Sequence, residues 1–465
     1  MAAFLLNGVE THFGEGERDL TLLDFVRRAG FTGAKEGCGE GECGACAVAI
    51  VRPHDTGSTY RVVNSCLIPL ALIEGHEVLT IEGIAASGQD AALRALAESG
   101  GSQCGFCTPG FAVSLTAEHC RPGRTGACST DALAGNLCRC TGYRPIADAA
   151  ASLIEPASGA LSDRLTRPAP AIKPSSGAGF VRPGTLAGVI DVLASAPDAV
   201  PIAGGTDLGI EQNKRDRRFG LLVGLEAVDE LRVFDASGTR VLIGAALPLT
   251  EIDERWVDAP PVWRRWLALF ASPLIRNRAT LGGNLATASP IGDSAPLLMA
   301  LDAVVHVAGP SGSRTIPVAH LFAGYRKTVL ERGELITAVE VRTQKSEGRP
   351  GGPGGPGTRV EFYKVARRRL NDISTVTAAI AVERDAGARV VSARVCLGGV
   401  AATPLRVEAA EQAVVGAVWD EAATARVQAV LADTLRPMTD HRGTREFRLA
   451  VAQSLVARFA WEHLR

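Results

Sequence analysis

The distribution of cysteine is the feature that most constrains what this chain can fold into. The chain has 465 residues and 11 cysteines, and eight of the cysteines lie in two tight groups that end at Cys140. The other three, Cys120, Cys128 and Cys396, are scattered. In a reducing compartment, clustered cysteines bind metal or carry redox chemistry more often than they form disulfides. The two groups therefore predict metal or redox centres, whereas Cys120 and Cys128, which lie in a polar loop between Cys107 and Cys138, are predicted to be plain residues.

Composition and charge exclude several other classes of protein. A chain of this length holds about three or four domains. The net charge of −1 argues against a general affinity for nucleic acid, which requires a basic surface. No apolar run reaches the roughly 18 residues that span a bilayer. The segment Met1–Asn7 lacks the basic region of a secretory signal. These observations predict a cytoplasmic protein that binds neither nucleic acid nor membrane.

Changes in composition divide the chain into segments of different character. The first alternates strand-like runs with a helical segment near Leu22–Ala29, and the second shows the apolar periodicity of helices. Two stretches rich in Pro, Gly and Ser lack that periodicity and predict a linker and a Gly/Pro-rich loop. The last segment has strand-like runs and a helical end. The predicted segments are 1–80, 81–155, the linker 156–179, 180–346, the loop 347–358, and 359–465.

The first cysteine group consists of Cys38, Cys43, Cys46 and Cys66, separated by four, two and nineteen residues. This spacing matches that of plant-type [2Fe–2S] ferredoxins, in which four thiolates hold two irons. Four neighbouring glycines allow the backbone to approach a small cluster closely: Gly37, Gly39, Gly41 and Gly44. The alternative is a zinc site, which usually has two closely spaced Cys pairs or a mixture of Cys and His. No His lies near this loop, so the pattern favours iron and sulfide.

The second cysteine group consists of Cys104, Cys107, Cys138 and Cys140. Two predicted helices, Pro109–Glu118 and Pro145–Leu153, begin just after the two pairs, with Pro in the first turn. Helix N-termini favour the negative charge of a thiolate-bound cluster. A Cys-x-Cys pair would crowd a tetrahedral zinc ion, so iron–sulfur chemistry is favoured here also, with zinc as the alternative. The motifs QCGFCTPG and NLCRCTGY, following the first group, resemble the iron–sulfur modules of the molybdenum hydroxylases, the family of xanthine dehydrogenase and its relatives. That resemblance implies a second [2Fe–2S] cluster.

Two Gly-rich segments, Pro201–Leu208 and Ala279–Ser294, could expose backbone amides to a ligand, although a plain β-turn explains the first equally well. Both resemble the FAD-binding domain of the same family. From the residues alone, Phe270 is a core residue, Lys364 lies on a solvated charged edge, and Asp293 caps a helix. The resemblance instead assigns FAD contacts to Pro201, Ile202, Ala203, Gly204, Gly205, Thr206, Asp207, Leu208, Phe270, Thr280, Leu281, Gly282, Gly283, Asn284, Asp293, Ile336 and Lys364.

The resemblance also implies a fold, which is multidomain α+β. The expected parts are a β-grasp ferredoxin domain at 1–80, a four-helix [2Fe–2S] domain at 81–155, an FAD-binding domain of the vanillyl-alcohol oxidase (PCMH) type at 180–346, and an α+β domain like the C-terminal domain of CO dehydrogenase flavoproteins at 359–465.

The function implied is that of the electron-transfer small subunit in the xanthine dehydrogenase branch. Electrons would pass from a molybdopterin centre on a large partner subunit through two [2Fe–2S] clusters to FAD and then to NAD⁺, during oxidation of hypoxanthine and xanthine to urate. The family expectation is an α2β2 heterotetramer, with no catalytic residue for purine oxidation on this chain. Three alternatives stay open: a partner that oxidises an aldehyde or another N-heterocycle, a stand-alone iron–sulfur flavin reductase, and a zinc-bound scaffold.

Overall fold

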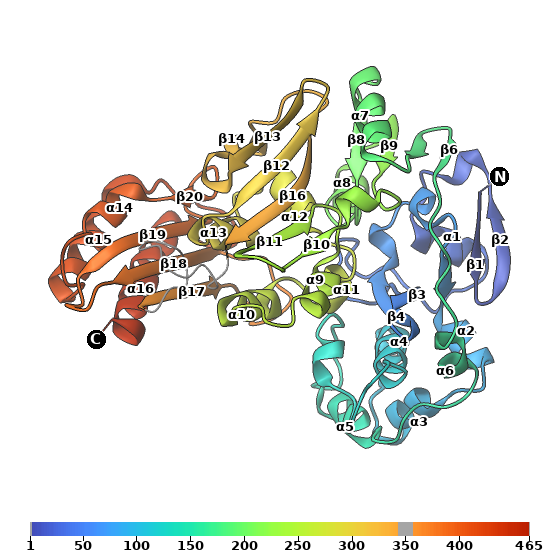
Figure 1. Ribbon diagram of the computed structural model, residues 1–465. Helices are drawn as coiled ribbons and strands as arrows, with labels where there is room; N and C mark the ends of the chain where they lie inside the picture. The colour runs from blue at the N-terminus through green and yellow to red at the C-terminus, as the bar shows by residue number, and fades with distance from the viewer. Residues whose placement is uncertain (1, 343–356, 465) are drawn as a thin grey trace. The chain divides into compact units, whose positions relative to one another are not determined.

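A computed structural model describes residues 2–342 and 357–464, and the chain divides into two compact units (Figure 1). Unit one contains Met1–Val189, Asp198–Val228 and Ala271–Ala279, and unit two contains Ile190–Pro197, Asp229–Phe270 and Thr280–Arg465. Apart from its last two positions, the predicted Gly/Pro-rich loop at 347–358 lies outside the described residues.

The first sheet of unit one has the strand order β2-β1-β5-β3-β4. Its strands are β1 (Ala2–Leu6), β2 (Val9–Phe13), β3 (Ala47–His54), β4 (Gly57–Asn64) and β5 (Glu77–Leu79). β1 pairs in parallel with β5, and the other pairs are antiparallel. Helix α1 (Leu22–Arg28) begins at Thr21, whose hydroxyl accepts a hydrogen bond from the Asp24 amide, and it buries Leu22 and Val26 in the core of this sheet. The predicted β-grasp fold is confirmed.

Four helices follow this sheet: α2 (Ile81–Ala86), α3 (Ala91–Glu98), α4 (Thr108–His119) and α5 (Arg144–Ser152). Every residue of α4 from Gly110 to His119 is buried, because α4 packs against α2, α3 and strand β3. Phe111 and Leu115 share a core with Leu96 of α3 and Ile146 of α5. The predicted helical [2Fe–2S]-binding fold is therefore confirmed.

The segment 156–179 corrects the prediction of a linker without regular structure. It contains helix α6 (Ala160–Leu165) and strand β6 (Ser175–Gly177). Leu161 and Leu165 are buried in a core shared with β3 and β4, and the Tyr60 hydroxyl donates a hydrogen bond to the Leu161 carbonyl at 3.1 Å. Two apolar side chains at helical spacing were too few to reveal a period in the sequence.

A second sheet in unit one has the order β6-β7-β9-β8, with β7, β9 and β8 parallel. Its further strands are β7 (Phe180–Arg182), β8 (Ala199–Ile202) and β9 (Leu221–Gly224). The helices of this region are α7 (Leu186–Ser195), α8 (Leu208–Arg215) and α11 (Pro273–Arg276). β8 ends at Ile202 and α8 begins at Leu208, so residues 203–207 of the predicted flavin-binding segment Pro201–Leu208 form a turn that connects the carboxyl end of a parallel strand to the start of α8.

Unit two contains a five-stranded sheet of order β10-β11-β16-β12-β13, a four-stranded sheet of order β17-β18-β19-β20 and a two-stranded sheet of β14 and β15. The strands are β10 (Phe234–Asp235), β11 (Arg240–Gly244), β12 (Val304–Gly309), β13 (Gly312–Pro317), β14 (Phe322–Gly324), β15 (Lys327–Thr328), β16 (Leu335–Arg342), β17 (Thr358–Val365), β18 (Val376–Arg384), β19 (Val390–Gly398) and β20 (Leu405–Arg406). The helices are α9 (Leu249–Arg255), α10 (Pro261–Leu269), α12 (Leu281–Ala286), α13 (Ser294–Ala300), α14 (Glu408–Gln412), α15 (Glu421–Thr434) and α16 (Arg445–His463).

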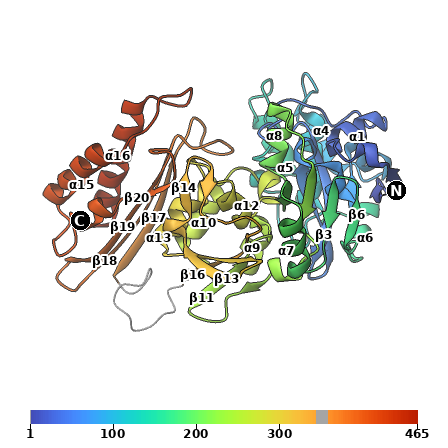
Figure 2. The ribbon, with the colours of Figure 1, turned by 90° about the horizontal axis from the view of Figure 1, so that it is seen from above.

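Figure 2 shows α15 and α16 side by side along the four-stranded sheet. Val427 of α15 and Val456 and Phe459 of α16 are fully buried against the alternating apolar residues of β18 and β19. This arrangement confirms the predicted α+β character of the C-terminal segment. Within the described residues, no helix has both the length and the apolar character required to cross a membrane.

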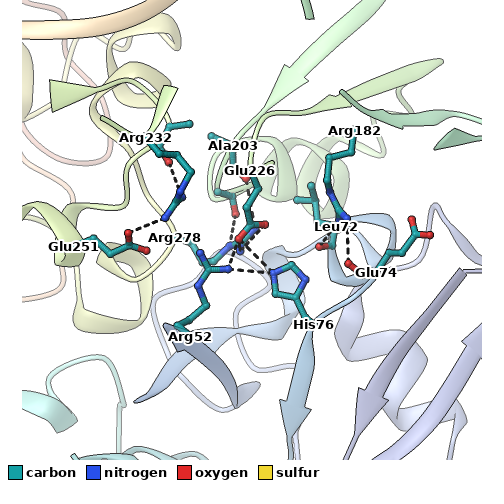
Figure 3. Close-up of polar contacts among 12 residues, drawn as sticks. Arg52, Leu72, Glu74, His76, Arg182, Ala203, Glu226, Arg232, Glu251 and Arg278 are labelled. Carbon is teal, nitrogen blue, oxygen red and sulfur yellow. Dashed lines mark hydrogen bonds and ion pairs between the residues drawn. The ribbon is translucent and has the colours of Figure 1, made fainter. Parts of the chain in front are cut away.

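A buried cluster of charges lies inside unit one (Figure 3). The Glu226 carboxylate accepts hydrogen bonds from the guanidinium groups of Arg52 in β3 and Arg278, the latter at 3.3 and 3.4 Å. The His76 ring lies 3.3 Å from the same carboxylate. Burial by itself would raise the pKa of Glu226, but Arg278 and Arg52 hold it well below its usual value. The cluster joins the first sheet to the residues around the predicted flavin-binding turn.

We expect Glu226→Ala to lower the free energy of unfolding by about 3–5 kcal/mol, because it leaves two buried guanidinium groups without their counter-charge. Urea denaturation followed by circular dichroism would measure the change. Glu10→Ala, at an exposed position in β2, is the control and should change stability by less than about 0.5 kcal/mol. Equal unfolding midpoints for the two variants would contradict this account.

We also expect stability to depend on pH through His76. Burial lowers the pKa of this fully buried imidazole, so at mildly acidic pH the unfolded chain binds a proton that the folded chain does not. Stability should therefore fall as pH decreases below the unfolded pKa of about 6.5. Denaturation midpoints between pH 8 and pH 5 should fall less steeply in His76→Gln. Parallel pH profiles for the two proteins would show that His76 does not contribute.

Candidate iron–sulfur and flavin sites

The first cysteine group lies at one end of the β-grasp domain. Cys38, Cys43 and Cys46 belong to the loop between α1 and β3, and Cys66 belongs to the short 3₁₀ helix at Ser65–Leu67. The Cys46 and Cys66 sulfurs are 3.3 Å apart. Cys38 and Cys43 form the second pair, since each thiol shifts the pKa of the other. The structure therefore brings all four predicted ligands together as two pairs of thiols.

Neighbouring groups make the Cys38 thiol more acidic than an ordinary cysteine. The pKa of Cys38 is lowered to about 5, and the Cys43 thiol is the largest cause. The backbone amides of Glu40 and Cys43, both 3.4 Å from the Cys38 sulfur, lower it further. The pKa of Cys43 is raised, because its interaction with the Cys38 thiol and its burial both favour the protonated form. A thiolate is the form that ligates metal, so the loop already stabilises the ligand state at one position.

The residues fit a [2Fe–2S] cluster, which takes two cysteines on each iron. In the described ranges, no three Cys, His, Asp or Glu side chains are placed as ligands of one metal ion, whereas two pairs meet the need of a binuclear cluster. Gly44, with a φ of +65°, lies so close to the loop at Gly135 that a Cβ would come within 2.4 Å of the Gly135 oxygen. A Cβ on Gly37 would lie 2.8 Å from the Cys43 sulfur, so the backbone of this loop lies close to a thiol at that position.

The second group lies at the N-terminal ends of α4 and α5, as expected. Cys107 is the residue immediately before α4, and Cys138 and Cys140 precede α5. Here Cys104 pairs with Cys140, and Cys107 pairs with Cys138, since in each pair one thiol shifts the pKa of the other. Burial is the main cause that raises the pKa of Cys107 to about 12. These four thiols again form two pairs and fit a second binuclear cluster.

The two pairs of the second group differ in exposure. Cys104 and Cys140 are exposed, whereas Cys107 is half-buried and Cys138 is buried. Two aromatic side chains next to the exposed pair, Phe106 and Tyr143, are 46% and 44% exposed. One edge of the second site therefore lies at the surface of unit one, beside exposed aromatic rings.

Asn136 joins the two cysteine sites. Its side-chain amide donates to the Gly44 carbonyl at 3.1 Å, and its side-chain oxygen accepts from the Ser114 hydroxyl of α4 at 2.7 Å. The next amide, that of Leu137, donates to the Cys43 carbonyl at 2.9 Å. The loop that carries Cys138 is therefore bonded directly to the loop that carries Cys43. Sequence reasoning missed Asn136, although it stands two residues before Cys138 in the second motif.

The three scattered cysteines are buried. Cys120 ends α4 and accepts a hydrogen bond from the Gln89 side chain at 3.1 Å, and burial raises its pKa. Burial also raises the pKa of Cys128 to about 11 and raises that of Cys396. The prediction that Cys120 and Cys128 lie in a polar loop is wrong, because both side chains are buried. Their protonated, buried thiols agree with plain residues.

The predicted flavin contacts Pro201–Leu208 belong to unit one. Gly204 approaches Arg278 so closely that a Cβ would lie 1.9 Å from the Arg278 carbonyl oxygen, and Gly205 has a φ of +81°. The Arg278 guanidinium donates to the carbonyls of Ala203 and Gly204 at 3.4 and 3.3 Å (Figure 3). This fixed turn enters α8, and the Gly209 amide in the first turn of that helix donates to the Gly205 carbonyl at 2.8 Å. Contact between the turn and the diphosphate of FAD stays a prediction.

The other predicted flavin contacts belong to unit two. Thr280 caps α12 by accepting a hydrogen bond from the Gly283 amide at 3.0 Å. A Cβ on Gly282 would lie 2.6 Å from the Ala245 side chain, so only glycine fits there. Gly283 is exposed, and the Asn284 side-chain oxygen accepts from the Ser294 hydroxyl. The segment Thr280–Asn284, including Leu281, therefore has a backbone set by tight packing.

Asp293 and Lys364 form a buried ion pair with an Nζ–Oδ2 distance of 2.8 Å. Lys364 also donates to the Leu269 carbonyl at 2.9 Å, and Asp293 accepts from the Ser374 hydroxyl. The solvated interpretation of Lys364 is wrong, because its side chain is buried. Asp293 stands at the N-cap position of α13, as predicted, but its side chain makes no capping hydrogen bond. Both residues lie within one polar network, and their contact with FAD stays a prediction.

Phe270 and Ile336 are both buried. Phe270 ends α10 with its ring centroid 5.3 Å from that of Trp266, and Ile336 lies in β16. The Trp266 indole donates to the Asp293 carbonyl at 3.0 Å, which links this aromatic group to the ion pair. The packing agrees with the core interpretation of Phe270, and the predicted contacts of both residues with the flavin ring stay predictions.

Four known domain families match consecutive parts of the chain, in the same order as its cysteine and glycine motifs. Residues 4–71 match the 2Fe-2S iron-sulfur cluster binding domain, and residues 80–151 match the [2Fe-2S] binding domain. Residues 174–342 match the FAD binding domain in molybdopterin dehydrogenase, and residues 361–463 match the CO dehydrogenase flavoprotein C-terminal domain.

Among curated proteins, the chain is similar to xanthine dehydrogenases. It is 30% identical to that of Emericella nidulans over 90% of this chain, and 31% identical to xanthine dehydrogenase 2 of Arabidopsis thaliana over 98% of this chain. The chain spans 35% and 39% of the length of these two relatives.

Among solved structures, the chain is similar to CO dehydrogenase from Oligotropha carboxidovorans, at 30% identity and a TM-score of 0.56. That match covers 63% of this chain and 99% of the other. Quinoline 2-oxidoreductase from Pseudomonas putida 86 gives 30% identity and a TM-score of 0.54, over 63% of this chain and 98% of the other. With the paired thiols and the four matched domains, these similarities show that the chain belongs to the molybdenum hydroxylase family and carries its iron–sulfur and FAD-binding domains.

Proposed function

We propose that this chain is the electron-transfer subunit of a xanthine dehydrogenase. It passes electrons from the molybdopterin centre of a large partner subunit, where hypoxanthine and xanthine are oxidised to urate, to NAD⁺. The similarity to xanthine dehydrogenases along almost the whole chain supports this branch of the family. Two small and two large subunits would form an α2β2 heterotetramer.

The observation that carries the proposal is the exposed edge of the second cysteine site. Cys104 and Cys140 reach the surface of unit one beside Phe106 and Tyr143, whereas Cys46 and Cys66 of the first site are buried. Exposed aromatic side chains are common at the centre of protein interfaces. An external electron donor therefore meets the second site first, and this edge is the docking surface for the partner.

When bound, the clusters carry single electrons, and FAD exchanges both single electrons and hydride. The residues of this chain hold those groups in order. Asn136 and Leu137 bond the loop of the second site to that of the first and keep the two sites adjacent. Arg278 fixes the turn proposed for the FAD diphosphate from within unit one. Hypoxanthine and xanthine would react on the partner, so no acid–base residue for purine oxidation is assigned here.

A second candidate is the corresponding subunit of a molybdenum hydroxylase with a different substrate. The similarity to quinoline 2-oxidoreductase and to CO dehydrogenase supports it, because those solved chains match at an identity close to that of the xanthine dehydrogenases. The two candidates share the electron-transfer role and differ in the substrate of the partner.

We expect Cys104→Ser to remove the second cluster alone, lowering iron from about four to about two atoms per chain. Iron and acid-labile sulfide analysis of the purified chain would measure the loss. Cys120→Ser is the matched control, because Cys120 lies in the same domain outside both groups of paired thiols and should retain all the iron. Zinc in place of iron, or equal iron in both variants, would contradict the cluster assignment.

We expect the tagged chain, isolated from its native cell, to retain a molybdenum-containing partner and to reduce NAD⁺ when xanthine is added. The reason is that the proposed route leads from the partner through this chain to the nicotinamide. Parallel assays with quinoline and with an aldehyde distinguish the second candidate. Iron and FAD without a molybdenum partner would contradict both candidates and leave a stand-alone flavin reductase.

A further inference from the structure

Helix α8 lies between two features of unit one that the proposed function requires to work together. It begins at Leu208, immediately after the predicted flavin-binding turn, and ends at Arg215. It packs along the 3₁₀ helix that carries Cys66, the fourth ligand of the first cluster. One short helix therefore runs from the proposed FAD diphosphate site to the first iron–sulfur site.

The packing at the N-terminal end of α8 is backbone against backbone. A Cβ on Gly209 would lie 2.4 Å from the Leu67 carbonyl oxygen and 2.7 Å from the Leu67 Cα. A Cβ on Gly205, in the turn itself, would lie 3.1 Å from the same oxygen. Leu67 is the residue that follows Cys66. A side chain at Gly209 would therefore collide with the segment that carries the fourth ligand, and one at Gly205 would crowd it.

At the other end of α8, Asn213 bonds to both segments that carry the ligands of the first cluster. Its side-chain amide donates to the Cys66 carbonyl at 2.7 Å and to the Gly39 carbonyl at 2.9 Å. A primary amide has two N–H donors, and these two bonds use both. Asn213 thus ties the loop that bears three cysteines to the separate segment that bears the fourth.

The bond to Gly39 also reaches a ligand sulfur through one peptide group. The Gly39 carbonyl and the Glu40 amide belong to the same planar peptide, and the Glu40 amide donates to the Cys38 sulfur at 3.4 Å. Donation from Asn213 to the carbonyl orients this peptide and polarises its N–H toward the sulfur. Hydrogen bonds to ligand sulfurs tune the reduction potential of iron–sulfur clusters, and outer residues that support the ligands share this effect.

We propose that Asn213 is a positioning residue for the first cluster: through the Gly39–Glu40 peptide and the Cys66 carbonyl, it raises the reduction potential of the cluster and holds it against the flavin-binding turn. The proposal rests on the proposed function, because it requires that the first site holds a [2Fe–2S] cluster. The sign follows from electrostatics. Reduction adds negative charge, which a stronger N–H donor to the Cys38 sulfur stabilises.

The test is a potentiometric titration of the full chain with its cofactors, in which electron paramagnetic resonance follows each reduced cluster. Cys104→Ser, which removes the second cluster, identifies the signal of the first. In Asn213→Ala, the potential of the first cluster should shift to a more negative value with an altered signal shape, and the second cluster should keep its potential. Loss of the first cluster alone from this variant would also support the proposal, since it shows that Asn213 holds the ligand segments together.

Gln212→Ala is the matched control. Gln212 is the adjacent residue of α8, and its amide donates to the Asp19 carbonyl at 2.6 Å, away from the cysteines. It should leave both potentials unchanged. Asn213→Gln, which keeps the amide, should recover part of the shift. Equal potentials and signals in wild type and Asn213→Ala would overturn the proposal while leaving the proposed function intact, whereas absence of the two cluster signals from the wild type would overturn the proposed function itself.

Discussion

The geometry of unit one depends on the way that eight thiols are held in four pairs. Each set of four sulfurs that shares two irons comes from two chain segments, which must approach each other without steric conflict. The β-grasp domain supplies one set from a loop and a 3₁₀ helix, and the helical domain supplies the other from the residues before α4 and α5. Asn136 then bonds the second set to the first through Gly44. The order of the two sites is therefore built into the packing of the two domains.

A buried cluster of charges connects the first sheet to the predicted flavin-binding turn. Glu226 neutralises Arg52 from the first sheet and Arg278 from the chain beside the flavin-binding turn. Such a cluster is costly to bury, and its stability requires that each charge keeps its partner. Arg278 also donates to the carbonyls of Ala203 and Gly204. Through Glu226, the position of that turn is therefore linked to Arg52 of the ferredoxin fold. Together with α8, the cluster explains how iron–sulfur and flavin-binding segments form one compact unit.

The sequence predicted the grouping of the cysteines because spacing and glycine placement are local properties, and the order of the folds followed from the family resemblance. The helices α4 and α5 were also predictable, since each follows a cysteine pair and has Pro in its first turn. Asn136, Asn213 and Glu226 were missed because their roles depend on contacts between distant segments, such as the contact between Cys66 and Asn213, which are 147 positions apart. The burial of Lys364 was missed for a similar reason, as its counter-charge, Asp293, lies 71 residues away. Local pattern identifies ligands, whereas the residues that position them are found only in the folded chain.

The central claim is that this chain holds two distinct [2Fe–2S] clusters close enough to exchange electrons. Its most direct test is electron paramagnetic resonance of the purified chain after anaerobic reduction. The account predicts two different signals, each integrating to about one spin per chain, with broadening that reports magnetic coupling between neighbouring clusters. A single signal, or two signals without any sign of coupling, would contradict the adjacency that Asn136 and Leu137 establish.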